Sequence, residues 1–174
     1  MIDQQQFRDL MSGVCAPVTV VTTMVDDTAH GATVSSFASL SLDPPLVSVA
    51  FDRGSRLLRQ IQAAGRFGVN ILGQAQGDLA VLFARHGVDR FAVTTWFEQD
   101  GLPRLADAPG WMVCDLHQTV EAGDHLLLFG LVRSASSRPG QPPLVYAHRT
   151  FGTHSHFAQR PRPAIVDQIA ACAR

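Results

Sequence analysis

Hydroxyl side chains are concentrated between residues 30 and 45. This stretch holds five of them within nine positions: Thr33, Ser35, Ser36, Ser39 and Ser41. Gly31 precedes them, and a rigid Pro44-Pro45 pair follows. Hydroxyl and backbone N–H groups are neutral hydrogen-bond donors, suited to a carbonyl-rich ring edge or to a phosphate. Composition alone also fits an edge strand followed by a loop, so both interpretations stay open at this point.

Histidines are the other candidate reactive residues. His125 follows a Gly-Asp turn, a place where a lone histidine usually has a structural role. His154 and His156 would point to one face of a strand, and His148 lies close by in the sequence. No Asp, Glu or Cys nearby completes a usual ligand set, so we expect no metal site and favour a histidine-rich terminal loop.

Many short strands and few helices must position these residues. Apolar periodicity and turn residues predict strands at 17–25, 29–39, 46–51, 67–72, 112–121, 124–134 and 144–151, and helices at 3–13, 55–64, 76–85 and from 164 onward. Asp26-Asp27 is expected to form the turn between the first two strands. Residues 95–110 are expected to form a surface excursion, and the apolar run 46–51 suggests burial on both faces. This balance favours a mainly β fold, an antiparallel barrel with inserted helices.

One helix start could bind an anion. Ser55 is placed to cap a helix that Gly65 ends, and the free N–H groups after Ser55 and Arg56 favour a phosphate. A simple cap explains Ser55 equally well, and a solvated charge explains Arg53 or Arg56. Asn70, within an apolar strand, needs buried partners and is expected to be structural.

Bulk composition limits the possible partners and compartment. The chain has 174 residues, 46% apolar and 17% charged, with a net charge of −1, which fits one compact domain and gives no attraction to nucleic acid or anionic lipid. All 14 basic residues are arginines. Three distant cysteines without a Cys-x-x-Cys pair, and no signal-like or membrane-spanning run, indicate a reducing compartment, the cytoplasm.

The hydroxyl-rich stretch is part of a longer ordered pattern. It reads Gly31-x-Thr33-x-Ser35-Ser36-Phe37-x-Ser39-x-Ser41-x-x-Pro44-Pro45. Other segments follow the same pattern: Pro17-x-Thr19-Val-Val-Thr22-Thr23, Gly65-x-Phe67-x-Val69-Asn70-Ile71-Leu72, Phe83, Asp89-Arg90-Phe91, Gly123-Asp124-His125, Gly130-x-Val132 and Pro143-Leu144-Val145-Tyr146. Over about residues 5–157 the chain resembles the flavin reductase domain family, the small reductase components of two-component flavin-dependent monooxygenases.

The resemblance implies an antiparallel split β-barrel over residues 1–160, with a tail and short helix at 161–174. Such barrels are usually homodimers that bind FMN or FAD in a groove near the dimer interface. Hydride would pass from C4 of NADH or NADPH to N5 of the flavin, and the reduced flavin would go to a separate monooxygenase. By position, the flavin-binding residues would be Gly31, Ala32, Thr33, Val34, Ser35, Ser36, Ala50, Phe51, Asp52, Ser55, Arg56 and Phe83.

The resemblance also implies a place for the nicotinamide. In similar proteins the histidine at position 125 approaches it, so His125 is the expected catalytic residue, orienting the donor or supplying a proton afterwards. Tyr146, His148 and Arg149 lie on the predicted last strand, which resembles a nicotinamide-binding segment. This chain reads Tyr-Ala-His-Arg-Thr-Phe there instead of a Tyr-Arg-Gly-like run. Because no Gly-x-Gly-x-x-Gly is present, the donor would share the flavin groove.

Two of these matches also have plain structural interpretations. Phe83 at helical spacing is typical of a core residue, and Asp89-Arg90-Phe91 could hold a structural ion pair. Two other functions also fit the pattern: a module that carries FMN without turnover, and an enzyme that reduces a corrinoid cobalt or a nitro compound through a bound flavin.

Overall fold

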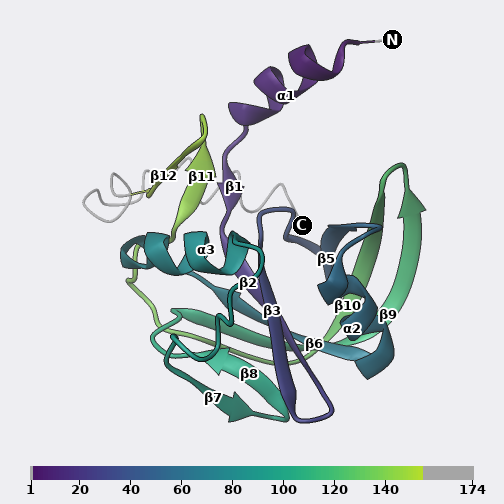
Figure 1. The fold of residues 1–174 in the computed structure, drawn as a ribbon, viewed down its shortest axis with the longest axis vertical. Coiled ribbons are helices and arrows are strands. Elements are labelled where there is room, and N and C mark those ends of the chain that lie inside the picture. The colour runs from purple at the N-terminus through teal and green to yellow at the C-terminus, as the bar shows by residue number, and fades with distance from the viewer. Residues whose placement is uncertain (1, 155–174) are drawn as a thin grey trace.

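A seven-stranded antiparallel sheet forms the body of the protein. The computed structural model describes residues 2–154. The strand order is β3 (Thr28–Val34), β2 (Thr19–Val25), β6 (Arg66–Ile71), β9 (Gly110–Ala122), β10 (His125–Ser137), β5 (Pro45–Asp52) and β4 (Ala38–Leu42) (Figure 1). No backbone pairing joins β3 to β4 within the described residues. The sheet is therefore open between these strands, and the predicted mainly β, split-barrel fold is confirmed.

Apolar residues of six strands meet inside the curved sheet. Helix α2 (Arg56–Ala64) closes this core with Leu57, Leu58 and Ile61. The predicted caps of α2 are confirmed: the Ser55 hydroxyl accepts a hydrogen bond from the Leu58 N–H at 3.3 Å, and Gly65 ends the helix with φ 68°. Glycine favours this left-handed backbone because it has no Cβ.

Tight turns connect the neighbouring strands as predicted. Asp26 and Asp27 have φ values of 47° and 55°, the positive pair that a two-residue hairpin turn requires. Gly123 and Asp124 join β9 to β10. On β5, Val47 and Val49 are buried while Leu46 and Ser48 are half-buried, so the predicted burial on both faces is wrong.

The predicted strand 29–39 is also wrong, because a side chain interrupts it. β3 ends at Val34, and β4 begins at Ala38. Between them the Ser36 hydroxyl accepts a hydrogen bond from the Ala50 N–H at 2.9 Å and donates one to the Ala50 carbonyl at 3.0 Å. The hydroxyl thus takes the place of a backbone partner for β5 and turns the chain away from β3.

The predicted surface excursion 95–110 is instead a packed hairpin. Strands β7 (Trp96–Gln99) and β8 (Leu102–Leu105) form it, and the side chains of Leu102 and Leu105 are fully buried. Asn70 holds the hairpin in place, because its amide accepts a hydrogen bond from the Leu105 N–H at 2.8 Å and donates one to Val20 at 3.2 Å. The structural role predicted for Asn70 is confirmed.

A second core lies under helix α3 (Gly77–Ala84), which follows a short 3-10 turn, η1 (Gln74–Gln76). Phe83 and Ala80 of α3 pack there against Val18 and Val20. The Thr33 hydroxyl donates a hydrogen bond to the Ala80 carbonyl at 2.6 Å, which fixes α3 to β3.

The ends of the described chain form a small separate sheet. It contains β1 (Ala16–Pro17), β11 (Val145–Ala147) and β12 (Thr150–Gly152). The predicted strand 144–151 is wrong, because His148 and Arg149 have φ values of 49° and 60° and form a turn between β11 and β12. Helix α1 (Gln4–Ser12) projects away from the body (Figure 1). The predicted C-terminal helix and the boundary at residue 160 lie outside the described residues.

Candidate functional site

A groove with a volume of about 1100 Å³ lies beside the opening of the barrel. Its walls are β3 with the two serines after it, the end of β5, the start of α2, residues 86–91, and His125. The groove brings together most of the predicted site residues: Gly31, Ala32, Thr33, Val34, Ser35, Ser36, Ala50, Phe51, Asp52, Ser55, Arg56 and His125. Three sequence-distant segments and one histidine thus meet at one surface.

The start of α2 gives the groove a positive end. Arg56 makes no hydrogen bond or ion pair that the described part of the chain shows, and the first turn of α2 contains no acidic residue. Partial burial, and secondly the positive charge of Arg56, lower the pKa of His30 on β3 below its usual 6.5. Free N–H groups at a helix start add to this potential. An anion fits this end of the groove.

His125 begins β10, where it pairs with Asp52 at the end of β5, and its side chain is held by its neighbour. Its Nδ1 lies 2.8 Å from the Asp124 carboxylate. That hydrogen bond is the main reason why the pKa of Asp124 lies below its usual value. A carboxylate accepts only, so Nδ1 carries the proton and Nε2 is left to accept a hydrogen bond from a ligand when the imidazole is neutral.

Arg53 fastens the turn that carries His125. Its backbone N–H donates to the Asp124 carbonyl at 3.1 Å, and its Nε donates to the Gly123 carbonyl at 2.9 Å. Its guanidinium also lies 3.3 Å from the Glu121 carboxylate. The sequence was compatible with a solvated surface charge at Arg53. The structure instead shows that Arg53 connects the end of β5 to the β9–β10 hairpin.

Phe83 lies below the groove and not in its wall. Its side chain is fully buried, and its ring packs edge-on against Phe91 with centroids 5.2 Å apart. A Cβ atom at Gly31 would be 3.0 Å from the Phe83 ring. Phe83 therefore supports the backbone of Gly31 from beneath, and the flavin contact that the resemblance implies for it stays a prediction.

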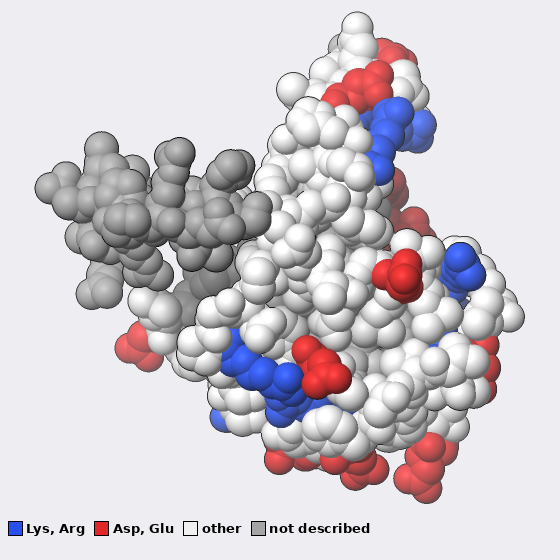
Figure 2. Space-filling model, turned by 90° about the vertical axis from the view of Figure 1, so that its left-hand side faces the viewer, with Lys and Arg blue, Asp and Glu red and all other residues white. Residues whose placement is uncertain are grey.

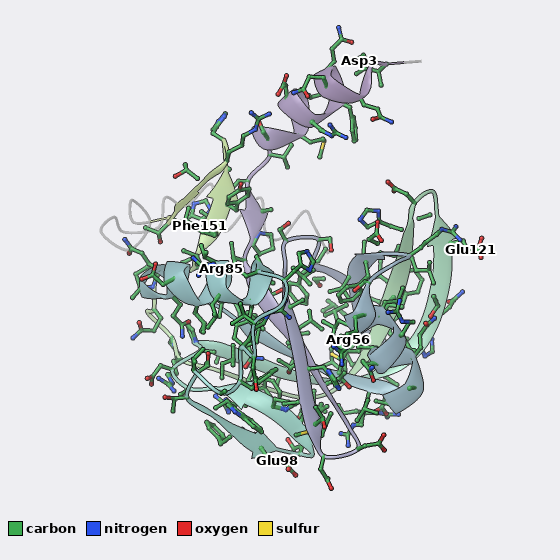
Figure 3. The ribbon with its side chains drawn as sticks, in the orientation of Figure 1. Asp3, Arg56, Arg85, Glu98, Glu121 and Phe151 are labelled. Atoms are coloured by element: carbon green, nitrogen blue, oxygen red, sulfur yellow. The ribbon has the colours of Figure 1, made fainter. Side chains whose placement is uncertain are left out.

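Tyr146, His148 and Arg149 lie away from the groove. Tyr146 packs against Phe151 with ring centroids 5.3 Å apart, and the Arg149 guanidinium lies 2.6 Å from Asp9 of α1. Figure 3 labels Phe151 and Glu121, which is close to His125, on opposite sides of the molecule. None of these three residues lines the groove that contains His125.

The sequence reasoning missed the wall formed by residues 86–91. The ion pair that Asp89-Arg90-Phe91 could have held does not form between Asp89 and Arg90: the Asp89 carboxylate accepts from the Ala92 N–H at 3.2 Å, and Arg90 binds backbone carbonyls. This segment has no regular secondary structure, so periodicity could not place it beside β3. The only available signal was the Asp-Arg-Phe match to the family pattern. Among residues 2–154 no cluster of His, Cys, Asp and Glu could hold a metal ion.

An antiparallel sheet that stays open between two of its strands, beside a groove lined by hydroxyl groups, defines the split-barrel class of domain. The chain belongs to the flavin reductase-like domain family, whose model matches residues 11–155. The NADH:riboflavin 5'-phosphate oxidoreductase of Streptomyces pristinaespiralis is 41% identical over 158 residues, which cover 87% of this chain and 89% of that protein.

Other relatives agree in sequence and in fold. A probable flavin reductase of Rhizobium meliloti is 38% identical over 88% of this chain, which spans half the length of that relative. The solved structure of nitrilotriacetate monooxygenase component B from Mycobacterium thermoresistibile matches with a TM-score of 0.87 at 33% identity, over 92% of each chain. The NADH:FAD oxidoreductase of Streptomyces globisporus, solved with NAD and FAD fragments, matches with a TM-score of 0.82 at 30% identity, over 92% of this chain and 94% of that one.

Proposed function

We propose that this protein is an NADH-dependent flavin reductase that supplies reduced FMN or FAD to a separate monooxygenase. The observation that carries the proposal is the groove, in which hydroxyl groups, backbone N–H groups, Arg56 and His125 converge. Relatives with the same fold are named for NADH and for FMN or FAD, and one is a monooxygenase component. Both flavins stay within the proposal.

The groove residues have distinct tasks in this proposal. Arg56 and the start of α2 hold the flavin phosphate, residues 31–36 bind the polar edge of the ring, and His125 orients the nicotinamide. The flavin accepts a hydride from the nicotinamide, a transfer in which no side chain needs to act as an acid or base. The protein contributes alignment of the two reactants and exclusion of water from the groove.

Steady-state oxidation of NADH and NADPH, with FMN and FAD in turn, tests this function. A flavin reductase oxidises the nicotinamide only when flavin is added, whereas a flavin-storage module shows binding without turnover. Gel filtration of the flavin-loaded protein distinguishes a flavin reductase from the remaining alternative, an enzyme that reduces another substrate through a bound flavin. A reductase that releases reduced flavin loses it on the column, while an enzyme that reduces another substrate through bound flavin retains it.

FMN binding is expected to take up a proton at His30. The pKa of this residue is lowered in the free protein, and a bound phosphate would raise it, so lowering the pH through 6.5 strengthens binding. For the free protein, the pH dependence of the folding stability has the opposite sign. The stability that neutral His30 contributes above pH 6.5 is lost as the pH falls towards the lowered pKa of His30.

Isothermal titration across this pH range, with the parent and with His30→Gln, measures the coupling. The comparison removes the titration of the phosphate itself, which is common to both proteins. Parallel pH profiles for the two proteins would contradict the assignment of His30 to the phosphate end.

His125→Ala is expected to affect the nicotinamide and not the flavin. Loss of one hydrogen bond from Nε2 is worth about 0.5–1.5 kcal/mol, or roughly a two- to twelvefold rise in the KM for NADH if binding is uniform. Flavin affinity should stay at the parent value. Stopped-flow reduction of bound flavin over a range of NADH concentrations measures the dependence on NADH, and titration with flavin measures the flavin affinity. A reduction profile identical to the parent's would make His125 a structural residue.

We also propose that the protein is a homodimer. Phe7, Leu10 and Met11 of α1, and Val14 just after it, recur at helical spacing, and each is between 45% and 68% exposed. No residue of α1 is buried by the described part of the chain. Figure 2 shows α1 standing above a surface with few charged residues. A second copy would cover this apolar face.

Leu10→Asp is expected to dissociate the dimer, because it places a charge in the centre of the apolar face. Gln5→Asp adds the same charge on the opposite side of α1 and should leave the dimer intact. Light scattering on a gel-filtration column gives the mass of each species. A parent protein with the mass of one chain would contradict the proposed dimer.

The compartment remains part of the proposal. Among the described residues no helix is long and apolar enough to cross a membrane. Cys15 and Cys114 are free thiols, and burial raises the pKa of Cys114 to about 12, so this thiol is unreactive. The cytoplasm, where thiols stay reduced, fits these cysteines.

A further inference from the structure

Arg90 joins two walls of the groove that the sheet does not connect. Its Nη1 donates a hydrogen bond to the Gly31 carbonyl on β3 at 2.7 Å. Its Nε donates to the Arg85 carbonyl, at the end of α3, at 3.1 Å, and its Nη2 donates to the same oxygen. Figure 3 labels Arg85 beside α3. One guanidinium therefore ties the α3 end of the 86–91 segment to β3.

Gly31 is held from behind as well. A Cβ atom at this position would lie 3.0 Å from the Phe83 ring and 3.1 Å from the Phe91 ring. The two aromatic rings pack against each other and against the second core. Because β3 is an edge strand, some of its carbonyl groups lack a strand partner. Arg90 binds one of them and fixes the backbone at the first residue of the 31–36 wall.

Arg90 is an unusual choice for a purely structural contact. No carboxylate pairs with it among residues 2–154, and burial lowers its pKa. Its hydrogen bonds all go to neutral carbonyl oxygens, although one lies at the carbonyl end of a helix, where a positive charge is favourable. The rigid fork of donors on arginine is suited to reach two oxygens from one side chain.

We infer that Arg90 is a positioning residue for flavin binding, which sets the separation between β3 and the 86–91 wall of the groove. The inference rests on the proposed function. Residues of both walls line the groove, and the 86–91 segment has no regular secondary structure to hold it there. Arg90 therefore acts on the flavin through Gly31 and the residues that follow it.

Two substitutions distinguish the role of the planar guanidinium donors of Arg90 from the role of its positive charge. Arg90→Ala removes both contacts, while Arg90→Lys keeps the positive charge but has one ammonium group in place of the fork. Arg138→Ala is the matched control, because Arg138 pairs at 3.3 Å with Asp107 outside the groove. For each protein we would measure the Kd for FMN by fluorescence quenching, the KM for NADH, and thermal unfolding.

Arg90→Ala is expected to raise the Kd for FMN about tenfold, in line with the loss of hydrogen bonds from a charged donor, and to leave the KM for NADH unchanged. Arg90→Lys should fall between Arg90→Ala and the parent. Guanidinium ion, added below the concentration that alters thermal unfolding, should restore FMN affinity to Arg90→Ala. It should have no effect on the control.

The outcomes separate this inference from the proposed function. Parent-like FMN affinity in the Arg90 variants overturns the inference while flavin reduction stands. A loss of affinity that only follows the loss of thermal stability, and that guanidinium does not restore, overturns it too. If Arg90→Ala does not fold, Arg90→Lys carries the same comparison. A parent protein that binds no flavin rejects the proposed function instead.

Discussion

Arg56→Ala is expected to weaken FMN binding by about ten- to a hundredfold and to leave riboflavin binding unchanged. The reason is the electrostatics of the groove, where Arg56 has no partner in the described chain and the start of α2 contributes further positive potential. Riboflavin has the same ring as FMN but no phosphate. A difference between the two ligands therefore reports on the phosphate contact alone.

The matched control for this experiment lies one turn further along the same helix. Arg59 donates a hydrogen bond to the Gly54 carbonyl at 3.1 Å, and it does not line the groove. Arg59→Ala should bind both ligands as the parent does. Titration of each protein with FMN and riboflavin gives four affinities. An equal loss for both ligands in Arg56→Ala would mean that Arg56 does not contact the phosphate.

Gly68→Val is expected to destabilise the fold by about 3 kcal/mol, which is a large part of the stability of a typical domain. Gly68 lies within β6, and the ring of the fully buried Trp111, from the neighbouring strand β9, packs over it. A Cβ atom at position 68 would be 2.2 Å from Trp111 and 2.9 Å from the Thr22 hydroxyl. Trp111 fills the core only because glycine leaves this space.

Gly77→Ala provides the contrasting case for urea unfolding. Gly77 begins α3 with helical backbone angles, and a Cβ atom there would be 3.8 Å from its nearest neighbour. Alanine should therefore stabilise the protein by about 0.4–1 kcal/mol. The double variant Gly68→Ala with Trp111→Phe should recover part of the loss caused by Gly68→Ala alone. Equal unfolding midpoints for Gly68→Val and the parent would contradict this description of the core.

The sequence was most informative where local chemistry determines the structure. Asp26 and Asp27 adopt the expected turn, and Ser55 and Gly65 end α2 as expected, because turns and caps depend on nearby residues. The ordered family pattern then placed residues 31–36, 50–52 and 55–56 at one site. The structure brings these three segments to one groove.

The errors arise where distant residues decide the outcome. The Ser36 hydroxyl bonds to Ala50 and ends β3 early, and nothing in the local pattern of residues 29–39 indicates that contact. Residues 95–110 look polar and turn-rich, yet Leu102 is fully buried against the barrel. Phe83 matched the family pattern, but its burial below Gly31 depends on the packing of α3 against β3.

Anaerobic stopped-flow mixing of the protein and FMN with NADH, and the same with FAD, tests the proposed flavin reduction. We expect the absorbance of oxidised flavin to decay far faster with the protein than without it. The rate should saturate with NADH and fall when deuterium replaces the transferred hydrogen at C4. Decay no faster than in the protein-free mixture, with either flavin and with NADH or NADPH, would contradict the assignment of this groove to flavin reduction.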